Sequence, residues 1–187
     1  MTKTLTDLTA TERRELTTAL HEAAHAVVGR VMGLTVRRAV IHAPDSLGHA
    51  GRCEFAAAPL GKPGEVDLAG TVAELRFERG PRFSAYAVTD RLGVHRDDRR
   101  ALVASGDPGT LDRTRRLIET TWSPIAELAA TLYGFGEVSG EQVDAALKLS
   151  EYDDESTMQL SAIRAGTWPA ARPIVPGGGE LWRLHQS

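Results

Sequence analysis

The sequence predicts a mainly α-helical fold with a small β-sheet, an α+β architecture, from two observations. Apolar residues recur at helical spacing through most of the chain, between capping residues and the glycines that end helices. Residues 34–43 are instead rich in β-branched side chains and end at Pro44-Asp45, which predicts a strand followed by a turn. A weaker strand at residues 48–57 is expected to pair with the first.

The first predicted helix begins after Thr9 and ends near Gly33. Thr9 with Glu12 three residues later forms a capping-box pattern, and Gly33 suits a left-handed helix stop. Apolar residues recur at helical spacing between them, which places residues 21–25 in the middle of a regular helix.

The later helices are predicted from the same kinds of signal. Pro63, the Ser123-Pro124 pair, and Ser139 with Gln142 mark helix starts. The stretch at residues 80–92 is expected to be an irregular surface loop. The predicted helices cover residues 64–79, 93–105, 111–122, 123–132 and 139–149.

The chain divides by composition into one domain, residues 1–150, and a C-terminal tail, residues 151–187. The tail is first acidic and then rich in Pro and Gly, so it cannot build its own core and is either disordered or laid across the domain. Trp168 and Trp182 in this tail are of the kind that anchors a segment on a protein surface, which makes a homo-oligomer a further hypothesis.

Composition excludes several classes of partner and compartment. A net charge of -3 gives no electrostatic reason to expect nucleic acid or an anionic membrane surface as partner. No signal core or apolar span is present, and the single cysteine, Cys53, fits a reducing compartment. The protein is therefore expected in the cytoplasm, with Cys53 as a packed small apolar residue.

The segment His21-Glu22-Ala23-Ala24-His25 is the most informative motif of the chain. Side chains four apart share one helix face, so both imidazoles can reach one zinc ion, with Glu22 beside its open coordination position as general base. The alternative is a helix whose histidines are half-buried or solvated and whose glutamate pairs with an arginine.

A catalytic zinc site usually has three protein ligands and a water, so a third ligand is needed. His42, His49, His95 and many Asp and Glu residues are candidates, and their spacing does not choose among them. Val31 stands where the longer form of the motif would have a third histidine.

Several segments together resemble the proteolytic domain of the FtsH-type ATP-dependent zinc proteases. They are residues 21–29 (HEAAHAVVG), 69–77 (AGTVAELRF), 93–101 (GVHRDDRRA) and the helical stretch 125–147. The resemblance covers roughly residues 10–148 in order.

This resemblance implies a fold, a ligand set and a cofactor. It places Asp97 at the family's third metal ligand, beside His21 and His25, with zinc as the metal; the adjacent Asp98 is the rival for that role. It also singles out Glu74, which either orders a metal ligand or pairs with Arg76 or a neighbouring helix. The family's ATPase module and membrane anchor have no counterpart in this sequence.

The function expected from these observations is that of a zinc-dependent metalloendopeptidase. Glu22 would act as general base on a metal-activated water, and the substrate would be a peptide or an unfolded protein held along an edge strand. A separate ATPase that delivers substrate is a further expected partner. The alternatives are a non-catalytic zinc-containing peptide-binding or adaptor domain, and a helical interaction domain with a fortuitous motif.

Overall fold

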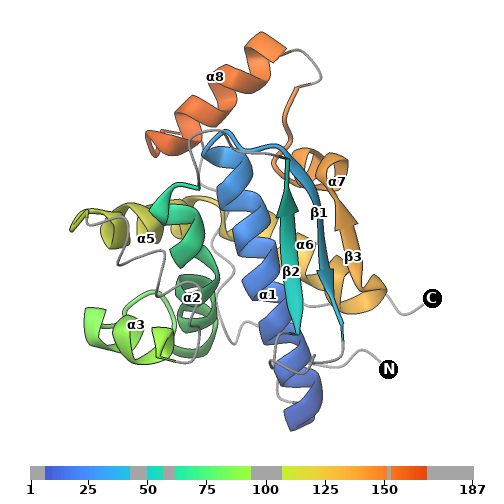
Figure 1. Ribbon diagram of the computed structural model, residues 1–187, viewed down its shortest axis with the longest axis vertical. Coiled ribbons are helices and arrows are strands. Elements are labelled where there is room, and N and C mark those ends of the chain that lie inside the picture. Colours follow the sequence, from blue (N-terminus) through green and yellow to red (C-terminus); the bar gives the residue numbers. More distant parts are fainter. Residues whose placement is uncertain (1–6, 43–49, 57–61, 94–106, 151–152, 168–187) are drawn as a thin grey trace.

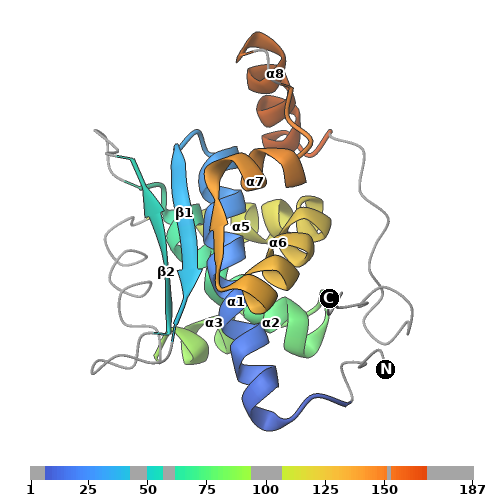
Figure 2. The same ribbon diagram turned by 90° about the vertical axis from the view of Figure 1, so that its right-hand side faces the viewer.

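A computed structural model describes five stretches of the chain: residues 7–42, 50–56, 62–93, 107–150 and 153–167. These stretches contain seven helices and three strands, which confirms the predicted mainly α architecture with a small sheet. Figures 1 and 2 show the sheet on one side of the long helix α1 (Ala10–Val31), with most other helices on the opposite side. Helix α1 is therefore the centre of the fold.

The caps of α1 are those that the sequence predicts. The Thr9 hydroxyl accepts a hydrogen bond from the Glu12 amide at 3.2 Å, and the Glu12 carboxylate accepts one from the Thr9 amide at 2.8 Å. At the other end, Gly33 adopts a positive φ of 91°, which a residue with a side chain rarely adopts. The start and end of the helix are thus fixed by local chemistry.

The sheet is antiparallel and has the strand order β2-β1-β3. Strands β1 (Val36–Ile41) and β2 (Gly51–Phe55) form the predicted pair. The third strand, β3 (Glu137–Ser139), was not predicted, because three residues are too few to show an alternating pattern. Strand β2 lies at one edge of the sheet, with β1 as its partner.

Helix α2 (Gly64–Arg79) has the predicted bounds, whereas the predicted loop at residues 80–92 is wrong in its second half. That half forms α3 (Ala85–Leu92), whose N-cap Ser84 accepts a hydrogen bond from the Ala87 amide. The glycine and proline at positions 80 and 81 lie in the connection before α3. Because both are loop signals, they extend the predicted loop over the short helix that follows.

Three further helices follow: α5 (Thr110–Thr120), α6 (Trp122–Phe135) and α7 (Gly140–Ala146). Ser139 and Gln142 form the predicted capping box of α7. The predicted N-cap at Ser123 is wrong, because α6 begins at Trp122 and its N-cap is Thr121, two residues earlier. Its proline stands in the first helical turn, where an amide hydrogen is not required. The helix predicted at residues 93–105 lies outside the described residues, apart from Gly93.

The last helix, α8 (Asp153–Arg164), lies in the stretch expected to be a tail. Its Leu160 and Ile163 are buried in the common core, and Arg164 donates a hydrogen bond to the Val31 carbonyl at 2.6 Å. Residues 153–167 are thus laid against the domain. The helix was not expected, because only two of its residues supply core contacts and the acidic start of the segment dominated its composition.

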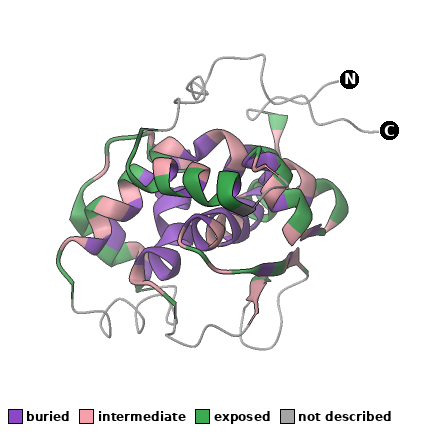
Figure 3. Cartoon of the chain, turned by 90° about the horizontal axis from the view of Figure 1, so that it is seen from above, coloured by how far each residue is buried: buried purple, intermediate pink, exposed green. Residues whose placement is uncertain are grey.

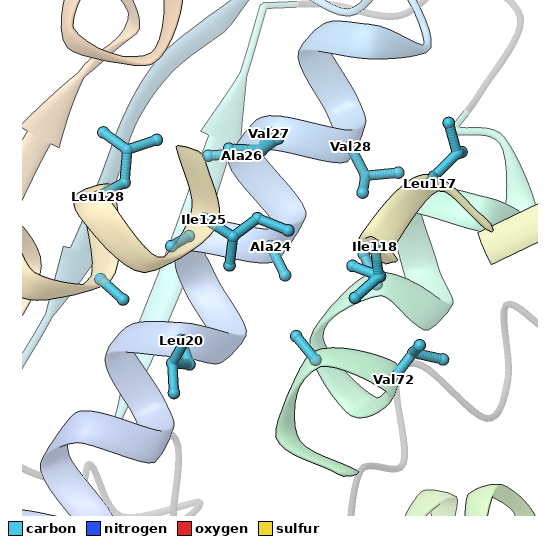
Figure 4. Packing of buried hydrophobic residues seen from close by; sticks show 14 of the residues in the cluster. Leu20, Ala24, Ala26, Val27, Val28, Val72, Leu117, Ile118, Ile125 and Leu128 are labelled. Atoms are coloured by element: carbon cyan, nitrogen blue, oxygen red, sulfur yellow. The ribbon is translucent and has the colours of Figure 1, made fainter. Parts of the chain in front are cut away.

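One apolar core lies around α1 (Figure 3). In Figure 4, Ala24 of α1 lies between Ile125 of α6 and Val72 of α2, with Leu20 one turn earlier on α1, and all four are almost fully buried. The core therefore holds α1 against α2, and this contact positions the motif histidines.

Among the described residues, no helix is both long and apolar enough to cross a membrane.

Candidate metal centre

The two histidines of the motif lie side by side in the middle of α1. Their Nε2 atoms are 2.9 Å apart, and their ring centroids are 4.6 Å apart. Both side chains are half-buried. The helical spacing of four residues thus brings the two rings together, as expected for a pair that shares one helix face.

Helix α2 holds both rings by their Nδ1 atoms. His21 Nδ1 lies 2.8 Å from Glu74 Oε1, and His25 Nδ1 lies 2.7 Å from the main-chain carbonyl oxygen of Val66. A carbonyl oxygen can only accept a hydrogen bond, so His25 carries its proton on Nδ1; an ionised Glu74 imposes the same arrangement on His21. Partners of this kind fix the tautomer of metal-binding histidines.

This arrangement leaves each neutral ring with an electron lone pair on Nε2, directed toward the other ring. Two lone pairs at 2.9 Å repel each other unless a cation, either a metal ion or a proton, lies between them. Zinc bound at its usual Zn–N distance in tetrahedral geometry would set the two nitrogens roughly 3.3 Å apart. The observed separation needs only a small ring movement to reach that value, so the donor pair fits zinc.

Glu74 is buried and engages two donors at once. While Oε1 faces His21, Oε2 accepts a hydrogen bond from Arg91 Nη1 of α3 at 3.0 Å. The side chain of Glu74 is only 5% exposed. Arg76 instead pairs with Glu119 and lies over the ring of Trp122. Both roles considered for Glu74 are thus met in part: it contacts a motif histidine, and it pairs with an arginine of a neighbouring helix, α3, although not with Arg76.

A glycine permits the close approach of α2 to the histidine pair. A Cβ atom on Gly70 would lie 2.5 Å from both Cε1 and Nε2 of His21, which is closer than any carbon side chain can approach. The absence of a side chain at this position therefore brings the backbone of α2 against the nitrogen that would bind a metal.

Glu22 is buried on a different side of α1, against the edge strand. A Cβ atom on Gly51, the first residue of β2, would lie 3.0 Å from Glu22 Oε1. Cys53 lies on the same strand. Burial raises the pKa of its thiol far above the ordinary value, and the nearby negative charge of Glu22 raises this pKa further. Cys53 is thus an inert packed thiol, and Glu22 lies beside β2.

A third ligand for the histidine pair is not found among the described residues. Asp97, its rival Asp98, His49 and His95 all lie outside the described residues, and His42 is exposed at the end of β1. Within the described stretches, no group of three or more His, Cys, Asp and Glu side chains is arranged to hold a metal ion. The structure therefore brings together His21 and His25 but does not test the role of Asp97.

Two contacts of this centre could not be read from the motif. The Val66 carbonyl is a main-chain group that every residue type carries, so the sequence does not indicate that it contacts His25. Arg91 lies in the segment for which the residue pattern predicts a loop. The signal that indicates a helix there is Ser84, which is a good N-cap three residues before Ala87.

The protein-family models and the curated proteins contain no match for this chain. The resemblance to the FtsH-type peptidase domain therefore stays a prediction from sequence segments. The geometry of His21, His25 and their partners on α2 stands independently of it.

Proposed function

We propose that this protein is a zinc-dependent metallopeptidase in which His21 and His25 bind the metal and Glu22 is the general base. The observation that carries the proposal is the pair of Nε2 atoms 2.9 Å apart, with both Nδ1 atoms engaged by acceptors on α2. A helix that used its histidines only for packing would not need two imidazoles to direct lone pairs at one point.

The metal ion and Glu22 would have different roles in hydrolysis. Zinc, when bound, lowers the pKa of a coordinated water and polarises the carbonyl that is attacked. Glu22 would take a proton from the attacking water and deliver it to the leaving nitrogen. Asp97 is proposed as the third ligand from the family resemblance alone.

The edge strand supports a peptide as substrate. In the described part of the chain, β2 pairs with β1 on one side only, so its other edge can offer main-chain groups to an extended peptide. Glu22 packs against Gly51 at the start of this strand. A peptide added to β2 would therefore run past the proposed base, which favours an unfolded protein segment or a peptide over a small molecule.

The experiment that tests this function compares wild type with Glu22→Gln. Glu15→Gln serves as the matched control, because Glu15 is exposed on the same helix. Glu22→Gln should retain zinc and lose hydrolysis of an unstructured protein such as casein by about 100-fold or more, the usual contribution of a general base.

The outcomes of this assay separate the two candidate functions. Undiminished hydrolysis in Glu22→Gln would reject the proposed role of Glu22. Zinc bound by a wild-type protein that cleaves no peptide would favour the alternative, a zinc-containing peptide-binding or adaptor domain. A homo-oligomer, a separate ATPase that delivers substrate, and a cytoplasmic location remain proposals on the sequence grounds given above.

A further inference from the structure

Helix α3 places Arg91 beside Glu74, the residue that contacts the Nδ1 atom of His21. Its Ala87, Val88 and Leu92 are buried in the core, which fixes the helix against α2. This packing places Arg91 beside the buried carboxylate of Glu74, with a hydrogen bond of 3.0 Å between Nη1 and Oε2. The second terminal nitrogen of Arg91 contacts Glu78, one helical turn further along α2.

The geometry at Glu74 links Arg91 to His21 through a single carboxylate. One oxygen faces the imidazole at 2.8 Å and the other faces the guanidinium. A carboxylate that is 5% exposed needs partners for both oxygens, because few water molecules can replace a lost donor. The orientation of the carboxylate, and with it the oxygen offered to His21, therefore depends on both donors.

We propose that Arg91 is a positioning residue of the metal centre: it holds Glu74 in the orientation that fixes the His21 ring and the nitrogen that carries its proton. This inference rests on the proposed function, since the ring is positioned for a metal. Arg91 itself does not touch the metal or the substrate.

The shape of the arginine side chain suits this task. Its planar guanidinium has several donors in a fixed fork, so it can hold Glu74 and Glu78 at the same time. A lysine carries one compact charge on a flexible stem and lacks this fork. Lysine at this position should therefore keep the charge but restore only part of the positioning.

The first test is zinc affinity, measured by competition with a chromophoric chelator. Arg91→Gln should weaken zinc binding by about 10-fold, the lower end of the effect of removing a partner of a metal ligand. Arg91→Lys should fall between this variant and wild type. Arg79→Gln is the matched control, because it removes a positive charge from an exposed position at the end of α2 and should leave zinc affinity unchanged.

A double-variant cycle shows whether Arg91 acts through Glu74. If it does, Arg91→Gln should have little further effect on zinc affinity in a Glu74→Gln protein, so the two losses should not add. Equal losses in both backgrounds would overturn the inference, because Arg91 would then act by another route.

A readout without zinc separates this inference from the proposed function. Imidazole nitrogen chemical shifts, measured by NMR on metal-free protein at constant pH, report which ring nitrogen carries the proton. Arg91→Gln should alter the shifts of His21 more than those of His25, because the Nδ1 of His25 keeps its main-chain acceptor, with thermal unfolding as a check that the variant is folded. Unchanged His21 shifts would overturn the role of Arg91 even if wild type binds zinc. A wild type that binds no zinc would reject the proposed function.

Discussion

His21 and His25 are equivalent in the motif but are supported in different ways. His21 is held by two successive side chains, Glu74 and then Arg91, from two helices. His25 is held directly by a main-chain carbonyl, that of Val66 in the first turn of α2. The His21 support can be altered by substitution, whereas the His25 support depends only on where α2 lies. The metal affinity of the site should accordingly be tunable from the His21 side alone.

The largest expected effect is that of filling the space beside His21. Gly70→Ala would place a methyl group 2.5 Å from the ring, so α1 and α2 would have to separate or the ring would have to turn. We expect a loss of about 1–3 kcal/mol in the free energy of unfolding, typical of overpacking, together with loss of zinc binding. Urea unfolding and zinc titration measure both.

Gly134→Ala is the matched control for this variant. A Cβ atom at Gly134 of α6 would meet nothing within 4 Å, so alanine there should raise the free energy of unfolding by about 0.4–1 kcal/mol. Equal effects of the two substitutions would mean that α2 does not approach His21 as closely as described.

The next effect is that of removing the acceptor of His21. Glu74→Gln should weaken zinc binding by about 10- to 100-fold, because an amide supports the required tautomer less firmly than a carboxylate. Glu119→Gln is the control: this glutamate of α5 is 44% exposed and pairs with Arg76 of α2, so its replacement should leave zinc affinity unchanged. Similar zinc affinities in the two variants would remove the distinction between the histidine supports.

A smaller effect on the site is expected from Val66→Ala. This substitution removes buried methyl groups, so it should lower the free energy of unfolding by roughly 1–3 kcal/mol. It leaves the carbonyl in place, and zinc affinity and the nitrogen shifts of His25 should therefore stay close to wild type. A loss of zinc affinity as large as that of Glu74→Gln would show that the His25 support is not set by the backbone alone.

The smallest effect belongs to a half-exposed carboxylate–arginine pair on the sheet, which contrasts with the buried Glu74 carboxylate beside His21. Glu54 on β2 accepts hydrogen bonds from Arg38 on β1, and chiefly this contact lowers the pKa of the Glu54 carboxyl below its ordinary value of 4.5. Its stabilising contribution is therefore fully present above about pH 4.5 and is lost as pH falls through the lower folded-state pKa.

Glu54→Gln should consequently flatten the acid limb of the stability–pH curve slightly, while zinc affinity at neutral pH stays the same. Thermal unfolding between pH 3 and pH 7, an ordinary acid series, measures this change. An acid limb identical to that of wild type would show that the surface pair contributes nothing measurable, as many exposed ion pairs do.

The parts of the fold that the sequence predicts are those decided by local chemistry. The caps at Thr9 and Ser139 require only neighbouring residues, and both were predicted. The three-residue strand β3 and the helices α3 and α8 depend on contacts with distant segments, which short patterns do not reveal. The same division runs through the site: helical spacing predicts that His21 and His25 meet, but Arg91 requires the packing of α3 to be known.

The most direct test of the central claim is the zinc content of the purified protein, measured by elemental mass spectrometry for wild type beside His25→Ala and Asp97→Ala. The account predicts close to one zinc ion for each wild-type chain and loss of zinc in His25→Ala, with loss in Asp97→Ala if that residue is the third ligand. A wild-type protein that holds no zinc, even after zinc is added, would contradict the claim that the histidine pair is a metal site.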